Sequence, residues 1–178
     1  MTIYLARHCE SEYNVKGLLN GDPSIKVSLT KKGTEQAKSL AQSLNNTDFD
    51  VIYASELLRT QQTAHYINVY YNKDIVIDKR LNDNISGFEG RKIEEYINAI
   101  DATPDGYRAK FNDGESLEEV FARVKNFVDE LKHQNIQSCV IITSGYIIEC
   151  LYGIISDTYP SLPISFDIPQ GTYSALTI

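Results

Sequence analysis

The sequence predicts an α/β layer fold around a mostly parallel central sheet. Short runs of β-branched and apolar residues alternate along the chain with segments of helical periodicity. No internal repeat, low-complexity tract or linker interrupts this alternation. The chain has 178 residues, of which 42% are hydrophobic and 23% are charged, and these values are usual for one compact folding unit. We therefore expect a single domain that covers residues 1–178.

The first half of the chain is expected to alternate three strands with two helices. Thr30 is a favourable N-cap for the first helix, which places an apolar stripe on one face: Ala37, Leu40, Ala41 and Leu44. Ser55 followed by Glu56 is expected to begin the second helix, which runs to about Tyr71. The strands are expected at residues 2–6, 50–54 and 75–77.

An excursion from this regular pattern is expected at about residues 83–114. Four glycines, at positions 87, 90, 106 and 114, interrupt the segment, and a helix is expected within it from about Lys92 to Ile100. Loops that extend from a rigid scaffold commonly carry binding and catalytic residues. We therefore expect this excursion to face the substrate, as a lid does.

The second half contains the strongest helix signal in the chain. Ser116-Leu117-Glu118-Glu119 forms a capping box, and apolar residues accompany it at helical spacing: Leu117, Val120, Phe121, Val124, Val128 and Leu131. A central strand is expected at residues 139–142, a helix at 145–155 and a last strand at 173–178.

Charge and cysteine content narrow the class of protein. The 24 acidic and 17 basic residues give a net charge of −7, so long-range repulsion disfavours nucleic acid or an anionic membrane as a partner. The three cysteines, Cys9, Cys139 and Cys150, leave an odd thiol and show no C-x-x-C spacing. We see neither a signal-peptide pattern nor the roughly 20 apolar residues that a membrane span needs. These features predict a cytoplasmic protein in a reducing setting.

Polar side chains follow the expected strands at their carboxyl ends. Arg7 and His8 follow the first strand, and Ser55 follows the second. Residues 80–83 lie beyond the third strand, and Ser144 lies beyond the strand at 139–142. In open α/β sheets, ligands bind in the crevice outside this edge. We therefore expect these four segments to point polar groups at one crevice.

The Arg7-His8 pair points to phosphoryl chemistry. A neutral imidazole attacks phosphorus and carries the phosphoryl group, which splits one difficult step into two, and a neighbouring guanidinium neutralises charge on the phosphate oxygens. Arg59, about one turn into its helix, and Asn14, an amide donor, are further candidate phosphate ligands. Taken singly, each residue also fits a structural role, such as a half-buried histidine, a solvated arginine or a turn-capping asparagine.

Five blocks of the sequence carry a family resemblance. The first is Leu5-Ala6-Arg7-His8-Cys9-Glu10-Ser11, with Asn14, Asn20-Gly21-Asp22, Ser28-Leu29-Thr30 and Gly33-x-x-Gln36-Ala37 after it. The others are residues 53–60 with Thr63-Ala64, residues 80–83 with 87–90, residues 114–116 with Arg123, and residues 142–145. These blocks resemble the histidine phosphatase superfamily, in its phosphoglycerate-mutase-like branch, both in their residues and in their order. They extend from residue 5 to about residue 149.

The resemblance implies a three-layer αβα sandwich and assigns roles to residues. It implies a phosphohistidine intermediate on His8, with a phosphate clamp formed by Arg7, Arg59 and the block-five side chain, Ser144. Asn14 and the backbone near Gly21 are implied to help hold the phosphate. The family's general acid, usually glutamate, protonates the leaving alkoxide, and Asp83 stands at the matching position. A shorter acid is competent when its proton reaches the ester oxygen at about 2.6–3.2 Å; the alternative is a solvated loop aspartate.

Two positions depart from the family pattern. Cys9 stands where the family has glycine, and because consecutive residues of an extended chain point to opposite sides, we expect its side chain to face away from His8. Ser144 stands where the family has a second histidine that donates hydrogen bonds to the phosphoryl group. A serine hydroxyl donates one hydrogen bond and carries no charge, and loss of one such donor lowers turnover by about 10²–10³. His65 and His133 lie on or at the end of a helix and are not expected to replace it.

We expect a phosphomonoester hydrolase that acts on a small phosphorylated metabolite and is impaired by Ser144. Ser144 leaves three accounts open: a natural change with retuned chemistry, a pseudoenzyme, or a deliberate substitution that traps a ligand in a pocket otherwise suited to a phosphatase. The alternative functions are a non-catalytic protein that binds a phosphoryl ligand and, with less support, a phosphomutase. Three scattered histidines without metal-ligand spacing predict metal-independent action without a cofactor.

Two further sets of residues are candidates for contacts with a ligand or partner. Basic residues around the excursion are candidates to bind a second anionic group of the substrate: Lys79, Arg80, Arg91, Lys92, Arg108 and Lys110. Candidates for a homodimer contact are Tyr66, Tyr70 and Tyr71 with Leu162-Pro163-Ile164, although aromatic residues on a helix more often belong to the core.

Overall fold

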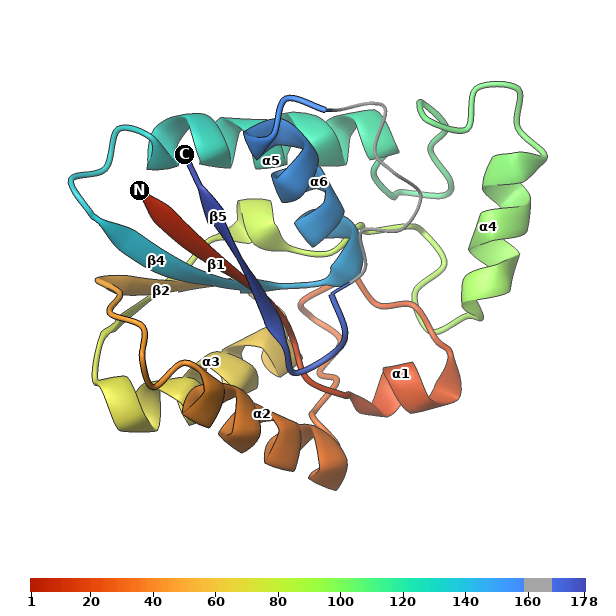
Figure 1. The fold of residues 1–178 in the computed structure, drawn as a ribbon. Coiled ribbons are helices and arrows are strands. Elements are labelled where there is room, and N and C mark those ends of the chain that lie inside the picture. The colour runs from red at the N-terminus through yellow and green to blue at the C-terminus, as the bar shows by residue number, and fades with distance from the viewer. Residues whose placement is uncertain (159–167) are drawn as a thin grey trace.

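The computed structural model describes residues 1–158 and 168–178. Within these ranges a five-stranded sheet, in the order β3-β2-β4-β1-β5, lies between two layers of helices (Figure 1). The strands β1 to β4 run parallel, and β5 pairs antiparallel with β1. Their bounds are β1 Thr2–Arg7, β2 Val51–Ala54, β3 Asp74–Ile77, β4 Ser138–Thr143 and β5 Tyr173–Thr177. The predicted three-layer αβα sandwich with a mostly parallel sheet is confirmed.

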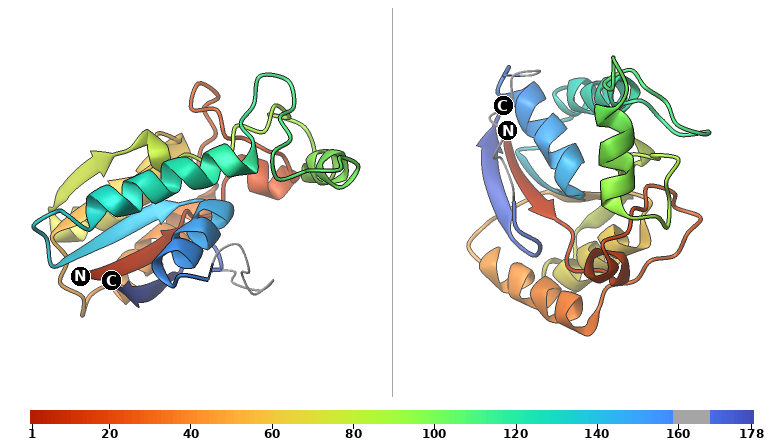
Figure 2. Two further views of the ribbon diagram at one scale, coloured as in Figure 1. Left: turned by 90° about the horizontal axis from the view of Figure 1, so that it is seen from above. Right: turned by 90° about the vertical axis from the view of Figure 1, so that its right-hand side faces the viewer.

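The helices cover the two faces of the sheet in pairs. On one face α2 (Lys31–Ser43) packs against α3 (Leu58–Tyr71), and on the other α5 (Leu117–Leu131) packs against α6 (Gly145–Ile155). The short α1 (Glu12–Lys16) and α4 (Ile93–Asp101) lie beyond the carboxyl ends of the parallel strands (Figure 2, left). A single 3-10 turn, η1 (Lys79–Leu81), follows β3.

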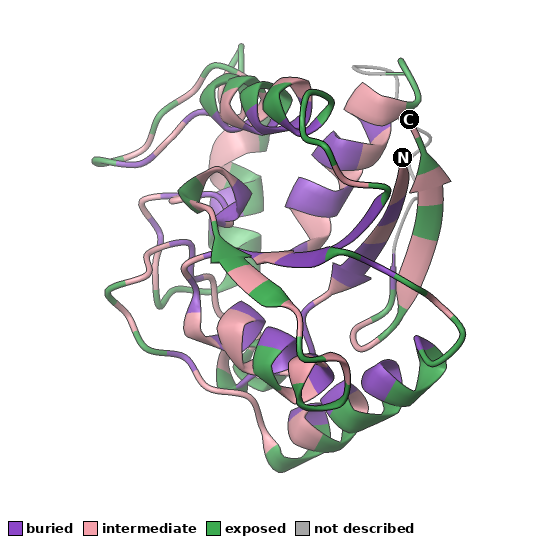
Figure 3. Ribbon diagram, turned by 90° about the vertical axis from the view of Figure 1, so that its left-hand side faces the viewer, coloured by how far each residue is buried: buried purple, intermediate pink, exposed green. Residues whose placement is uncertain are grey.

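The central strand β4 connects the two cores. Its side chains alternate, so that Cys139 and Ile141 pack with α5 and α6, whereas Val140 and Ile142 pack with α2 and α3. Every residue of β4 is buried (Figure 3). A strand covered on both faces needs apolar side chains in both directions, which explains the uninterrupted apolar run that predicted it.

Helix starts show where local chemistry agrees with the sequence interpretation. Thr30 caps α2 through Gly33 N, and Ser116 forms the predicted capping box of α5 with Glu119. The predicted start of α3 at Ser55 is wrong, because α3 begins at Leu58 after the uncapped Leu57. The Ser55 hydroxyl is already bonded to the Thr60 hydroxyl at 2.7 Å and accepts from Leu57 N at 3.3 Å.

The candidate dimer contact involves tyrosines on α3, which the structure describes, and a later segment, which it does not. Tyr71 belongs to the core edge, since its ring contacts Phe49 and its hydroxyl donates to the Ala41 carbonyl. Tyr70 is exposed. The other candidate, residues 162–164, lies outside the described residues. No described helix has the length and apolar character that crossing a membrane requires.

Candidate active site

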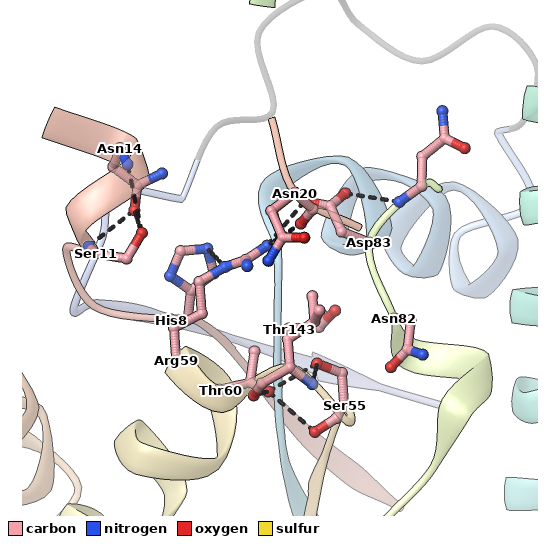
Figure 4. A network of polar contacts seen from close by, with 12 residues as sticks. His8, Ser11, Asn14, Asn20, Ser55, Arg59, Thr60, Asn82, Asp83 and Thr143 are labelled. Carbon is pink, nitrogen blue, oxygen red and sulfur yellow. Dashed lines mark hydrogen bonds and ion pairs between the residues drawn. The ribbon is translucent and has the colours of Figure 1, made fainter. Parts of the chain in front are cut away.

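A cavity of about 500 Å³ opens at the carboxyl edge of the sheet. Six side chains that the sequence singled out line it: Arg7, His8, Asn14, Arg59, Asp83 and Ser144. They come from β1, α1, α3, the loop after η1 and the start of α6, so the fold brings distant segments together as expected. Figure 4 shows His8, Arg59 and Asp83 converging from these separate elements.

The imidazole of His8 is held in one tautomer. Its Nδ1 lies 2.8 Å from the Cys9 carbonyl oxygen, which only accepts hydrogen bonds, so Nδ1 carries the proton. The other nitrogen, Nε2, accepts a hydrogen bond from Arg59 Nε at 3.1 Å. The Nε2 lone pair therefore points into the cavity beside a guanidinium, the geometry that a nucleophilic imidazole requires.

Burial and charge keep His8 neutral. The residue is 3% exposed, and this burial, assisted by the positive charges of Arg59 and Arg7, lowers its pKa well below the usual value. The hydrogen bond to the Cys9 carbonyl favours the protonated ring but is outweighed. A neutral ring keeps its nucleophilic lone pair at neutral pH.

Arg59 lies at the end of the cavity that holds His8 and Arg7, which we call the polar end. It lies in the first turn of α3, not a full turn inside the helix as predicted, and is buried. Its Nη2 donates to the Asn20 carbonyl at 2.8 Å and pairs with Asp83 Oδ2 at 3.4 Å. Burial lowers its pKa, and the charge of Asp83 opposes that effect. The guanidinium stays charged and is held by groups on three sides.

Arg7 and Ser144 meet at the N-terminus of α6. Arg7 is paired with Thr143 across the β1–β4 register, and a side chain at Gly145 would come within 3.3 Å of the Arg7 guanidinium carbon. Ser144 is the N-cap residue of α6, yet its side chain makes no capping hydrogen bond. Its Oγ is buried without a hydrogen-bond partner. Such an orphan hydroxyl at a helix N-terminus beside an arginine marks a place suited to an anion.

Asn14 presents one donor to the same end of the cavity. Its Oδ1 accepts from the backbone N and hydroxyl of Ser11, which caps the short helix α1. The Nδ2 group makes no hydrogen bond to a described residue. The capping box thus orients the amide so that its donor remains for a ligand.

Asp83 lies in a loop that Arg123 holds in place. Its Oδ1 accepts from Asn84 N at 3.0 Å, which leaves Oδ2 toward Arg59. Arg123, on α5, donates to the backbone carbonyls of Arg80 at 2.7 Å and Asp83 at 3.1 Å. The guanidinium of Arg123 is itself oriented by Glu115 at 2.8 Å. This arrangement fixes the position of the Asp83 carboxylate relative to His8.

Several sequence expectations about the crevice are wrong in detail. Ser55 does not line the cavity, because its hydroxyl is used inside the turn before α3. Arg80 turns away to Asp78 and Glu130. The expected phosphate contact of the backbone near Gly21 stays a prediction, although Gly21 itself is not among the described residues that line the cavity. A side chain there would meet the Asn84 carbonyl, so this glycine allows two backbones to pack, and its neighbour Asn20 lines the cavity instead.

Cys9 and the two remaining histidines lie away from the cavity. The Cys9 thiol packs into the core between the sheet and α2, where burial raises its pKa to about 11, so the expectation that it faces away from His8 is confirmed. His65 is exposed on α3, and His133 bonds to the Asp129 carbonyl at the end of α5.

The far end of the cavity is apolar, which the sequence interpretation did not identify. Its side chains come from α4 and from the segments that face it: Leu18, Ile93, Tyr96, Ile97, Ile100 and Leu117. The apolar residues at i, i+4 and i+7 of the predicted helix were the available signal. The sequence alone does not show whether this apolar face of the helix packs into the core or lines the cavity.

Comparison with known proteins agrees with this geometry. The family model described as histidine phosphatase superfamily (branch 1) matches residues 3–178. Phosphoserine phosphatase 1 of Hydrogenobacter thermophilus is 31% identical over 186 residues, covering 98% of this chain and 85% of that protein. The human 6-phosphofructo-2-kinase/fructose-2,6-bisphosphatase 4 is 32% identical over 88% of this chain but only 33% of its own length. The structure of α-ribazole phosphatase from Shigella flexneri is also similar, with a TM-score of 0.83 and 26% identity over 100% of this chain and 91% of that one.

Proposed function

The chain belongs to the histidine phosphatase superfamily, branch 1, and on that premise we propose that it hydrolyses a small phosphomonoester through a phosphohistidine on His8. The observation that carries the proposal is the fixed tautomer of His8, with Nδ1 tied to the Cys9 carbonyl and the Nε2 lone pair directed at the cavity beside Arg59. The similarity to a protein named phosphoserine phosphatase supports a phosphatase that acts on a small substrate.

In the first step His8 Nε2 attacks phosphorus, and the ester P–O bond breaks. Arg59 turns its N–H groups from Nε2 to the phosphate oxygens. Arg7 and the N-terminus of α6 also offset the negative charge there, and the Asn14 amide and the Ser144 hydroxyl donate hydrogen bonds. Asp83 donates a proton to the leaving alkoxide. The products are a phosphohistidine, the free alcohol and the Asp83 carboxylate.

In the second step the Asp83 carboxylate accepts a proton from water as its oxygen attacks phosphorus. The P–N bond to Nε2 breaks, inorganic phosphate leaves, and His8 returns to its neutral form. Asp83 is protonated again and ready for the next substrate. The Arg123 contacts to its loop keep the acid at the same distance in both steps.

Ser144 makes the chain a slow phosphatase in this proposal. Its hydroxyl supplies at most one donor, where a charged imidazole would supply both a donor and a positive charge. A second candidate, a protein that binds a phosphoryl ligand without turnover, is favoured by the same observation, since the Ser144 hydroxyl has no hydrogen-bond partner and the remaining clamp is complete.

Hydrolysis of an aryl phosphate by three versions of the chain separates these candidates. The native sequence is expected to be slow, Ser144→His to be about 10²–10³-fold faster, and His8→Ala to be inactive. Equal inactivity of all three versions, with vanadate still bound, would establish the binding role instead. Melting curves of each version confirm that the comparison is made between folded proteins.

The setting proposed for this activity is the reducing cytoplasm. Cys9, Cys139 and Cys150 are all free and buried, and burial raises the pKa of each thiol. Free thiols kept in this way fit a compartment that does not form disulfides. Fractionation of the native source followed by detection of the protein in each fraction tests the assignment.

A further inference from the structure

The cavity has two chemically different ends. The polar end holds His8, Arg7 and Arg59, whereas the other end is walled by apolar side chains from three segments. Leu18 follows α1, Leu117 begins α5, and the remaining side chains belong to α4. A phosphate at His8 would direct its ester substituent toward this second end, because the sheet and α3 close the opposite side.

Helix α4 turns an uncovered apolar face to the cavity. Ile93, Ile97 and Ile100 are spaced at i, i+4 and i+7, so they share one face. Ile93 is 37% and Ile97 is 48% exposed although both line the cavity. Single exposed apolar residues are common, but two exposed isoleucines that share one face with the half-buried Ile100 and line the catalytic cavity indicate a surface that an apolar ligand covers.

The apolar wall is held in place before any ligand binds. Tyr96, on α4, has its ring 5.7 Å from that of Phe88 and 5.9 Å from that of Phe111. Its hydroxyl accepts a hydrogen bond from Asn84 Nδ2 at 2.5 Å. Asn84 directly follows Asp83 in the chain, so this hydrogen bond ties the position of α4 to that of the general acid.

Positive charge in the cavity is confined to the phosphate end. All 17 lysine and arginine residues lie in the described ranges, because residues 159–167 contain none, and of these only Arg7 and Arg59 line the cavity. The basic residues of the excursion face outward, with Arg108 on Glu118 and Lys110 on Glu119. None of these basic residues is among the described residues that line the cavity, and their expected contact with a second anionic group stays a prediction.

Beyond the phosphate end, the described residues that line the cavity offer a second anion no lysine or arginine. They are apolar side chains, neutral polar ones such as Asn84, Ser86 and Tyr146, and the carboxylate of Glu149. An unpaired charge transferred from water to such surroundings is strongly disfavoured. An apolar group of the same size would gain from leaving water, by up to about fourfold in affinity for each methylene group covered.

Resting on the proposed function, we infer that the site selects phosphomonoesters of apolar alcohols, alkyl or aromatic, that carry no second negative charge. Ile97 determines this specificity, because it is the most exposed apolar side chain of the wall and lies at the middle of the α4 face. Amino acid phosphates and sugar bisphosphates are poor ligands, since their carboxylate or second phosphate has no cation to contact.

Binding of phosphonates, measured by calorimetry, tests the inference without requiring turnover. Hexylphosphonate is expected to bind at least about tenfold more tightly than ethylphosphonate, because four additional methylene groups reach the apolar wall. The acid 3-phosphonopropionate is expected to bind more weakly than ethylphosphonate. Ile97→Lys should abolish the preference for the hexyl chain and strengthen binding of the acid.

A matched control is Val69→Lys, which places the same charge on an apolar side chain that is 66% exposed on α3, outside the cavity. It should leave all three affinities unchanged. Ile93→Lys, at the start of α4, is a second variant with the same expected direction as Ile97→Lys. Equal affinities for hexylphosphonate and ethylphosphonate, or tightest binding of the acid, would overturn the inference.

Hydrolysis of hexyl phosphate and ethyl phosphate by the native chain and by His8→Gln distinguishes this inference from the proposed function. Turnover that depends on His8 but shows no hexyl preference refutes the specificity alone. A hexylphosphonate preference without any His8-dependent turnover refutes the hydrolase and leaves the apolar selectivity in place.

Discussion

Arg59 Nε donates a hydrogen bond of 3.1 Å to His8 Nε2, the nitrogen whose lone pair the mechanism uses. One guanidinium therefore protects the nucleophile until a phosphate competes for the same N–H group. The other contacts of Arg59, to the Asn20 carbonyl and to Asp83, involve Nη2. The N–H groups can turn to phosphate oxygens while the buried side chain stays in place.

Arg59→Lys is expected to lower kcat/KM for an aryl phosphate by about 10²-fold, because an ammonium group keeps the charge but loses the planar fork. Steady-state kinetics measure the loss, and inhibition by inorganic phosphate should weaken in parallel. Arg91→Lys, on an exposed arginine paired with Glu95 outside the cavity, is the matched control. Kinetics as fast as those of the native chain would show that Arg59 does not bind the phosphoryl group.

Asp83→Asn should slow alkyl phosphates by about 10²–10⁴-fold, because an alkoxide leaves only when an acid protonates it. The first step with 4-nitrophenyl phosphate should change little, since that phenolate leaves without a proton. Burst kinetics on the aryl ester and steady-state kinetics on an alkyl ester measure the contrast. Asp105→Asn, on an exposed aspartate near Arg108, controls for loss of charge. Equal losses on both esters would remove Asp83 from the acid role.

Arg123→Met is expected to reproduce a weaker form of the Asp83 defect. The carbonyls of Arg80 and Asp83 lose their donors, so the acid is placed less accurately and alkyl phosphates slow by roughly tenfold. The diagnostic quantity is the ratio of alkyl to aryl rates in the burst phase, which simple destabilisation does not alter. Arg123→Lys should restore part of that ratio. A uniform loss on both esters would mean that Arg123 serves only stability.

The lowered pKa of His8 predicts a pH dependence of stability. The unfolded chain takes up a proton at His8 below about pH 6.5, whereas the folded chain resists protonation, so stability falls as pH falls. The slope should reach about 1.4 kcal/mol per pH unit between pH 6.5 and the lower folded pKa. Urea unfolding between pH 7 and 5 measures it. His8→Gln should flatten this dependence, and His65→Gln, on an exposed residue, should not. A native chain equally stable across this window contradicts the buried neutral imidazole.

The raised thiol pKa values predict an unreactive folded protein. Burial raises the pKa of Cys9 to about 11 and that of Cys139 and Cys150 to about 12, so almost no thiolate exists at pH 8. A thiol reagent should modify none of them in the native state and all three after unfolding. Cys9→Ala should keep turnover within about twofold, because the thiol faces the core. Rapid native modification of Cys9 that stops turnover would place the thiol at the site.

Most of the fold was predictable because its signals are local or periodic. The capping box at Ser116 and the apolar runs of β1, β2 and β4 specify their elements without help from the rest of the chain. The start of α3 was not predictable in the same way. A hydroxyl that bonds to Thr60 in a turn and one that caps a helix have the same sequence pattern.

The polar half of the site was predictable, and the apolar half was not. Motif spacing placed His8, Arg59 and Asp83 at one edge because parallel strands end together. The expected second anion site stays a prediction, since Arg108 and Lys110 pair with glutamates at the surface and do not line the cavity. The roles of α4 and of Gly21 depend on which face a loop turns inward and on how closely two backbones approach, and no local pattern encodes either.

Trapping of the covalent intermediate tests the central claim most directly. The native chain, mixed with 4-nitrophenyl phosphate and quenched in alkaline denaturant, is digested and examined by mass spectrometry for a phosphorylated peptide. One phosphoryl group on the peptide that contains His8, absent in His8→Gln and present in His65→Gln, is the predicted result. Phosphate release that depends on the cavity but never phosphorylates His8 would contradict it.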